Sequence, residues 1–291
     1  MKNWIIVATF FSLWLSTQFD VRIQDYLAYG LILTFGVLHG ANDLAIIGKL
    51  SAEKQGYRKK LMRYLLVIAL VTVVFLVSKP MALLLFVGCS AYHFGEQHYG
   101  HGFKVSSNWN PILYVSYGLV VLFMIFVLQI NKVISIINEV SGFAIQSQEL
   151  VTGLFVSIGC YMLSLGLLYK KGVLEVNLVK EVFMLLVLAV VFYHASLAWA
   201  FCIYFIFWHS LPSLIDQLGY LYGEISWRSF RTYLRSSILY WSLSLVSMGL
   251  LYVFLKDDLD SFISLILYLL AAITFPHVLV MRKLETSKSA P

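Results

Sequence analysis

Long apolar runs occupy most of this chain, and they restrict it to a small set of folds. Apolar residues make up 60% of the sequence, whereas charged residues make up only 12%. Because soluble domains carry about a quarter charged residues, this composition indicates an integral membrane protein. In lipid every backbone polar group must be satisfied internally, which leaves helices or a closed barrel. The runs are continuous and do not alternate with polar residues, which favours an all-α fold.

The apolar runs predict a polytopic membrane helix bundle with about ten transmembrane helices. The predicted segments are 4–18, 26–48, 64–78, 81–99, 111–130, 151–169, 174–194, 195–216, 237–255 and 261–281. Residues 131–150 are expected to form a loop, and residues 217–236 to lie along the membrane surface. We expect a single integral membrane domain over residues 1–291, with a disordered tail at 285–291.

The positively charged residues predict the orientation of this bundle. With both termini in the cytoplasm, sixteen of the 21 Lys and Arg residues fall on the inner side and four on the outer side. This asymmetry agrees with the positive-inside rule. We therefore predict cytoplasmic termini and a multi-pass protein of the inner (plasma) membrane. The net charge of +6 is explained in the same way, and it does not indicate a nucleic-acid partner.

Four histidines lie inside apolar segments at a similar predicted depth: His39, His93, His209 and His277. At about 1.5 Å of rise per residue, their positions along the helices span a depth of about 6 Å. An ionisable group in hydrocarbon is costly and normally faces the bundle interior, so it indicates a functional site. Four imidazoles at one depth predict a shared metal centre. Neutral imidazole suits Fe, Cu, Zn or Ni, so the residue types alone do not name the metal.

Two of these histidines have a carboxylate nearby in the same predicted helix. Asp43 follows His39 by four residues and Glu96 follows His93 by three, so each pair is expected to share a helix face. A carboxylate in this position can accept the imidazole N–H and fix its tautomer. The alternative is a His–Asp pair that joins helices for structural reasons only.

Two further histidines and the three cysteines are not expected to bind the metal. His98 and His101 are expected to lie at the membrane interface. Cys89, Cys160 and Cys202 show no CxxC spacing, and we interpret them as small core residues.

Aromatic residues are concentrated just before His209, since the stretch 201–208 contains five of them. An aromatic stripe is usually ordinary packing, but beside a buried histidine its flat faces suit a rigid conjugated ligand. In the last apolar segment, Pro276 is expected to kink the helix and to aim His277 inward.

These motifs resemble a known family, the Brp/Blh family of bacterial β-carotene 15,15′-dioxygenases. The resemblance rests on four motifs in family-like order and spacing, which are His39-Gly40-x-x-Asp43, Tyr92-His93-Phe94-Gly95-Glu96, Trp208-His209-Ser210 and Pro276-His277. It implies a multi-helix membrane protein with non-haem ferrous iron. The implied reaction is cleavage of the central double bond of β-carotene by O₂, which yields two molecules of all-trans retinal.

The resemblance assigns His39, His93 and His209 to positions that bind iron. Some members carry a further histidine one turn after the third of these, where this chain has Ser213. We expect His277 to replace it because of its depth, and the alternative is a three-histidine site completed by water. A histidine introduced at position 213 is expected to be tolerated.

The resemblance also gives roles to the neighbouring side chains. Asp43 and Glu96 are expected to orient the ligands, or to act as ligands themselves. The expected walls of a polyene tunnel are Tyr92, Tyr204, Phe207 and Trp208. β-Carotene and O₂ are the implied substrates, and retinal implies a rhodopsin as recipient.

A second class of function fits the same features. A polyene- or haem-binding protein, or a proton-coupled transporter, would also bury histidines and carboxylates in a helix bundle. Such a protein would have no oxygenase activity. Transporters commonly show internal repeats, and the sequence has none that we detect.

Overall fold

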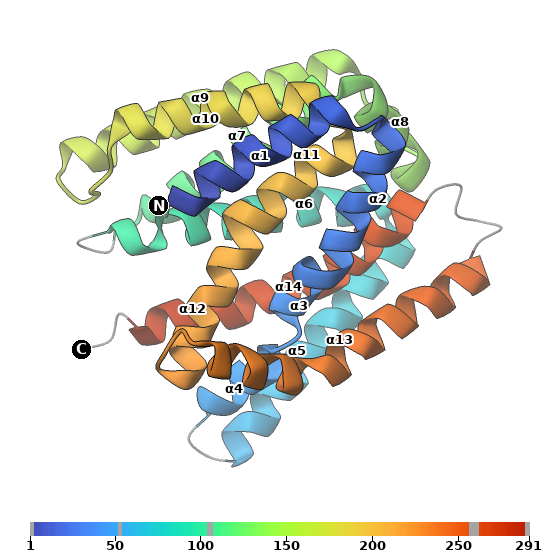
Figure 1. Ribbon diagram of the computed structural model, residues 1–291, viewed down its shortest axis with the longest axis vertical. Coiled ribbons are helices and arrows are strands. Elements are labelled where there is room, and N and C mark those ends of the chain that lie inside the picture. The colour runs from blue at the N-terminus through green and yellow to red at the C-terminus, as the bar shows by residue number, and fades with distance from the viewer. Residues whose placement is uncertain (1–2, 52–53, 104–106, 256–261, 289–291) are drawn as a thin grey trace. The chain divides into compact units, whose positions relative to one another are not determined.

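The computed structural model describes residues 3–51, 54–103, 107–255 and 262–288 (Figure 1). Within these ranges the chain is helical, and its extended structure is limited to an isolated β-bridge between Phe103 and Leu174. The predicted all-α fold is therefore confirmed. The chain divides into two compact units, each assembled from separate stretches of sequence. The predicted single domain stays a prediction.

Unit 1 comprises Met1–Ile32, Val87–Asn138 and Phe143–His209. Its elements are α1 (Asn3–Gln18), α2 (Val21–Leu31), the larger part of α6 (Lys79–Tyr99), η2 (Gly100–Gly102), α7 (Asn110–Leu128), most of α8 (Ile130–Ser141), α9 (Ser147–Lys170), α10 (Leu178–His194), α11 (Leu197–Ile203) and nearly all of η3 (Tyr204–Ser210). Helix α7 packs along α9, and α2 packs along α11.

Helices α6 and α7 approach each other so closely that two positions require glycine. A Cβ atom at Gly95 would lie 2.0 Å from the backbone oxygen of Tyr114, and one at Gly118 would lie 2.0 Å from that of Ala91. Small residues allow such close crossing of helix backbones in membrane proteins. This crossing fixes the part of α6 that carries His93.

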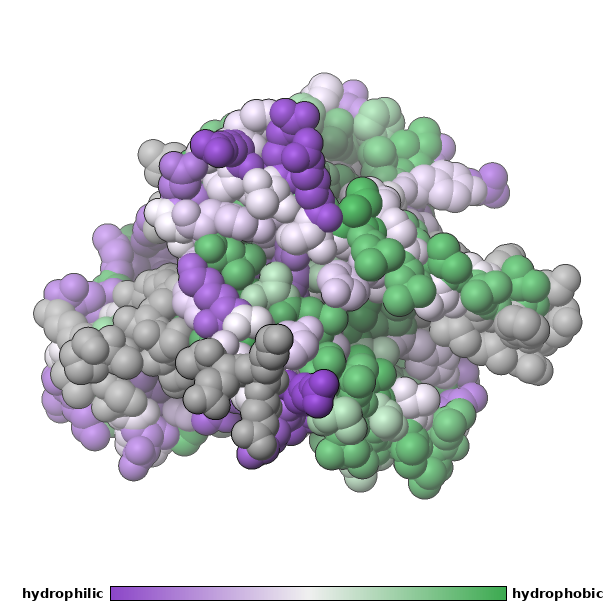
Figure 2. Space-filling view, turned by 90° about the horizontal axis from the view of Figure 1, so that it is seen from below, coloured by the Kyte–Doolittle hydropathy of each residue, from purple (hydrophilic) through white to green (hydrophobic). Residues whose placement is uncertain are grey.

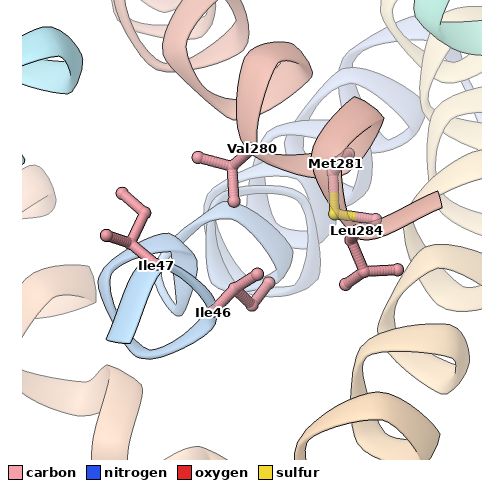
Figure 3. Close-up of a cluster of buried hydrophobic side chains, with 5 residues drawn as sticks. All are labelled: Ile46, Ile47, Val280, Met281 and Leu284. Carbon is pink, nitrogen blue, oxygen red and sulfur yellow. The ribbon is translucent and has the colours of Figure 1, made fainter. Parts of the chain in front are cut away.

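Unit 2 comprises Leu33–Phe86, Glu139–Gly142 and Ser210–Pro291. Its elements are most of η1 (Ile32–Gly36), α3 (Val37–Gly40), α4 (Asp43–Lys49), α5 (Lys54–Val77), the start of α6, α12 (Leu211–Tyr222), α13 (Trp227–Leu255) and α14 (Phe262–Lys288). Helix α14 packs against α3, α4, α5 and α13. Figure 3 shows the contact with α4, where Ile46 and Ile47 meet Val280, Met281 and Leu284 in a buried apolar cluster.

Two segments predicted as single helices are interrupted in the structure. The segment 26–48 contains the π-helix η1 and a turn at Ala41–Asn42, and the segment 195–216 contains the π-helix η3. A π-helix is rare and is often found at functional sites. One interruption precedes His39 and the other includes His209, so both modify a helix close to a predicted ligand.

Six helical segments among the described residues are long and apolar enough to cross a membrane: Val21–Lys49, Gly56–Val77, Asn110–Leu128, Ser147–Lys170, Leu197–Tyr222 and Leu267–Leu284. Trp4–Gln18 is a shorter apolar helix. This number does not support a count of ten, which stays a prediction together with the orientation of the termini. Large apolar side chains are exposed on several helices, and Figure 2 shows hydrophobic areas reaching the surface, as expected of a protein in contact with lipid.

Several local predictions are corrected by the structure. The expected loop at 131–150 begins as the helix α8, which buries Val133, Ile136 and Val140 along one face. The stretch 217–236 belongs mostly to α12 and α13, and its expected place along the membrane surface stays a prediction. The expected disordered tail is helical to residue 288, and 289–291 lie outside the described residues. Of the three cysteines, which are all free thiols, only Cys202 is buried and Cys160 is exposed.

Candidate active site

In unit 1 the structure brings together two of the four predicted ligands. The rings of His93, from α6, and His209, from η3, lie with their centroids 4.6 Å apart and at an angle of 76°. Both side chains are buried. Since these residues are 116 positions apart in the sequence, the fold and not the local chain places them side by side.

Two phenylalanine rings flank this pair. The Phe94 centroid lies 4.9 Å from that of His209, and Phe205 stacks on the same imidazole at 5.7 Å and 19°. Neither was singled out as a tunnel wall from the sequence. Phe205 precedes His209 by four residues, a spacing that could have indicated the contact.

Glu96 lies beside His93, as the spacing predicts. Its Oε2 atom is 3.9 Å from His93 Nδ1, which is longer than a hydrogen bond. Its Oε1 atom accepts a hydrogen bond of 2.8 Å from the hydroxyl of Tyr92. Tyr92, predicted as a tunnel wall, therefore orients this carboxylate.

In unit 2 the other two predicted ligands form a second pair. The ring centroids of His39, from α3, and His277, from α14, are 4.8 Å apart, and the rings are nearly perpendicular at 88°. Both side chains are buried. Helix α14 continues through Pro276, directly before His277.

Asp43 does not pair with His39, contrary to the prediction from their spacing. Its Oδ1 atom lies 2.7 Å from Nδ1 of His277, and its Oδ2 atom accepts a hydrogen bond of 3.2 Å from Tyr64. The turn at Ala41–Asn42 separates α3 from α4, so residues four apart no longer share a helix face here. The carboxylate therefore orients the histidine of another helix.

The contacts of Nδ1 assign the tautomers of this pair. Nδ1 of His39 lies against the backbone oxygen of Gly36, and Nδ1 of His277 lies against the carboxylate of Asp43. Because both partners are acceptors, each Nδ1 carries the proton, and the lone pair of each neutral ring is on Nε2. A metal-binding histidine commonly has its other nitrogen oriented by a carboxylate or a backbone carbonyl in this way.

The part of the chain that carries both histidine pairs matches a known protein family. The model of the beta-carotene 15,15′-dioxygenase family matches the chain over residues 30–285. The chain belongs to this family. The match confirms the Brp/Blh resemblance and identifies the chain as a carotenoid dioxygenase, for which the family implies β-carotene as substrate. No curated protein and no solved structure matches the chain.

The dioxygenase shows its histidines as two pairs. No group of three or more His, Cys, Asp or Glu side chains suited to hold a metal ion is found in the described part of the chain. The four-ligand iron centre therefore stays a prediction.

Three of the predicted tunnel walls are aromatic residues of η3 with different surroundings. The ring of Tyr204 packs against Phe94 with the centroids 5.2 Å apart, and Trp208 Nε1 donates to Thr9 Oγ1 at 3.0 Å. Phe207 is half-buried. Their role as walls of a polyene site stays a prediction.

His98 is half-buried, and its expected place at the membrane interface stays a prediction. Its Nε2 atom is 2.9 Å from Glu181 Oε2, and its ring stacks on Tyr117 at 4.3 Å. Tyr99 donates to the same carboxylate oxygen at 2.9 Å, and its hydroxyl is 2.7 Å from that of Tyr161. His98 thus belongs to a polar cluster inside unit 1. The side chain of His101 lies outside the described residues.

Proposed function

We propose that this dioxygenase cleaves the central double bond of β-carotene with O₂ and releases two molecules of all-trans retinal, with non-haem ferrous iron as cofactor. The observation that carries the proposal is the presence of two buried histidine pairs, His93–His209 and His39–His277, in a member of this family. Retinal would then pass to a rhodopsin.

The donor atoms suit iron. His39, His93, His209 and His277 would hold the ion through neutral imidazole nitrogens, with Asp43 and Glu96 as orienting carboxylates or as further ligands. Neutral imidazoles are suitable ligands for ferrous iron and leave coordination positions for O₂. When bound, ferrous iron supplies the one-electron steps that reactions of O₂ require.

The stoichiometry of the reaction demands little proton transfer from the protein. The bond between C15 and C15′ breaks, and each carbon takes one oxygen atom of O₂ to become an aldehyde. No external reductant and no net proton enter the balance. The side chains therefore have to bind and orient the polyene and exclude water. Phe94 and Phe205, which flank His209, are suited to contact a flat conjugated chain.

The substrate is consistent with a membrane location. β-Carotene is soluble in lipid, and the six long apolar helices support an integral membrane protein. We propose a multi-pass protein of the inner (plasma) membrane with cytoplasmic termini and about ten crossings, into which β-carotene enters laterally from the bilayer.

The proposal is tested with purified protein and in cells that accumulate β-carotene. The wild type is expected to contain stoichiometric iron and to convert β-carotene into retinal, detected by chromatography. His93→Ala is expected to abolish conversion while the protein still inserts. His194→Ala is the matched control, because His194 is exposed at the end of α10.

Three outcomes would contradict the proposal. These are a wild type without iron, a His93→Ala variant with near-wild-type conversion, and products shorter or longer than retinal. Binding of β-carotene without cleavage would instead favour a carrier.

A further inference from the structure

We propose that Gln217 and Tyr233 are positioning residues that hold His39 in its orientation toward His277. The inference deepens the proposed function and rests on it, because it concerns a predicted iron ligand. All four residues belong to unit 2. Neither Gln217 nor Tyr233 belongs to the motifs that indicate the family.

The helix that carries His39 is interrupted shortly after this residue, close to the point from which the imidazole faces His277. His39 lies in the short helix α3, which ends at Gly40 before the turn at Ala41–Asn42. A carbonyl group at such an interruption needs a donor from elsewhere when it is buried. The donor for the His39 carbonyl comes from α12, since Gln217 Nε2 donates to this oxygen at 2.8 Å.

Tyr233 fixes the orientation of that amide. Its hydroxyl is 2.8 Å from Gln217 Oε1, whereas it is 3.2 Å from the His39 carbonyl oxygen. A phenolic hydroxyl has one proton, so the shortest contact identifies its main acceptor as Gln217 Oε1. The amide nitrogen of Gln217 is then turned toward His39. Tyr233 and Gln217 are fully buried, which strengthens both hydrogen bonds.

The far side of the interruption is tied to the same helix. Asn42 Nδ2 donates to the backbone oxygen of Tyr233 at 3.1 Å, and Ser236 Oγ donates to Asn42 Oδ1 at 2.8 Å. Helix α13 therefore holds the chain on both sides of the turn. A shift of α3 relative to α13 would break several buried hydrogen bonds together.

Ser213, the residue at which this chain differs from the pattern implied by the resemblance, also contacts Gln217. It lies one turn before Gln217 in α12, and its hydroxyl accepts a hydrogen bond of 3.3 Å from Gln217 Nε2. Position 213, where the family resemblance implies a histidine in some members, thus belongs here to the network that supports the His39 backbone.

The test uses Gln217→Met, which keeps the length of the side chain and removes its donor, and Tyr233→Phe, which removes one oxygen atom. Residues that orient metal ligands typically change metal affinity by about 10- to 100-fold when substituted. We expect both variants to bind ferrous iron about 10- to 100-fold more weakly, with a lower kcat and an unchanged KM for β-carotene. The electron paramagnetic resonance spectrum of the nitric oxide adduct should also change.

Tyr268→Phe is the matched control. Tyr268 also lies in unit 2, and its hydroxyl donates to a backbone carbonyl, that of Val140, at 3.4 Å. We expect this variant to keep the iron affinity and spectrum of the wild type. A merely structural role for Gln217 and Tyr233 would lower the thermal stability without changing the spectrum of the iron that remains bound.

Two results separate the inference from the proposed function. Iron and retinal formation in the wild type, together with wild-type iron affinity and spectrum in Tyr233→Phe, would overturn the inference alone. Absence of iron from the wild type would overturn both. If Gln217→Met does not accumulate in the membrane, Tyr233→Phe decides, because it removes a single oxygen atom from a folded core.

Discussion

The Asp43 carboxylate and the His277 imidazole meet across two helices, with Oδ1 and Nδ1 2.7 Å apart although the residues are 234 positions apart in the sequence. Asp43 thereby assigns the proton of His277 to Nδ1 and leaves the lone pair on Nε2. Because Tyr64 donates to the second carboxylate oxygen, the orientation of the carboxylate is also fixed.

The first prediction concerns this contact. Asp43→Asn removes the negative charge and can turn an NH₂ group toward Nδ1, so the wrong tautomer of His277 is favoured. We expect iron affinity to fall about 10- to 100-fold, as measured by metal titration of the purified protein. Asp20→Asn is the control, because Asp20 is an exposed N-cap of α2 and Asn is an equally good cap. Unchanged iron affinity in Asp43→Asn would contradict the role given to Asp43.

The second prediction concerns the ring next to His209. Phe94→Leu keeps an apolar side chain but removes the flat face, and an aromatic contact contributes about 0.5–1.5 kcal/mol. We expect KM for β-carotene to rise about 2- to 10-fold with a smaller change in kcat. Phe155→Leu, at an exposed position of α9, should leave both constants unchanged. Equal kinetics in the two variants would remove Phe94 from the substrate site.

The third prediction concerns the crossing of α6 and α7. Gly118→Ala would place a Cβ atom 2.0 Å from the backbone oxygen of Ala91, so the helices must separate. We expect destabilisation of at least about 1–3 kcal/mol and loss of retinal formation, since overpacking at a rigid contact is costly. Gly159→Ala, where a Cβ atom meets nothing within 4 Å, is the control. Thermal unfolding in detergent compares the two, and equal midpoints would contradict the prediction.

The fourth prediction concerns position 213, where the structure changes the expectation. From the sequence, a histidine here should be tolerated. Ser213 is fully buried and hydrogen-bonded to Gln217, so a larger ring has to displace its neighbours. We now expect Ser213→His to destabilise the protein by about 1–3 kcal/mol. Unfolding measurements with Ser213→Ala as the smaller control test this, and a fully stable Ser213→His variant would restore the first expectation.

The sequence was informative where a pattern repeats over many residues. Continuous apolar runs predicted helices correctly, because a long run in lipid has few other solutions. The short motifs predicted the family, which the match over residues 30–285 confirms. The close sequence spacing of His93 and Glu96 also predicted their proximity, since α6 is continuous between them.

The sequence was less informative where a helix is interrupted. The spacing of His39 and Asp43 predicts a contact only in a regular helix, and the turn between them redirects the carboxylate to His277. No local signal marks the π-helices η1 and η3, because π geometry depends on the packing around a segment as well as on its residues. The partners Gln217 and Tyr233 lie far from His39 in sequence, and only the folded chain brings them together.

The π-helical segments before His39 and around His209 have a consequence for engineering this enzyme. A π-turn holds one residue more than the α-turn it replaces, and each residue of an α-helix advances the chain by about 100°. Deleting a single residue from Ile32–Gly36 would therefore restore a regular α-turn and keep the His39 imidazole facing His277, whereas the same deletion in a regular α-helix turns everything beyond it by about 100°. These two stretches are thus expected to tolerate the loss of one residue better than the α-helical turns beside them, and a deletion scan would reveal it.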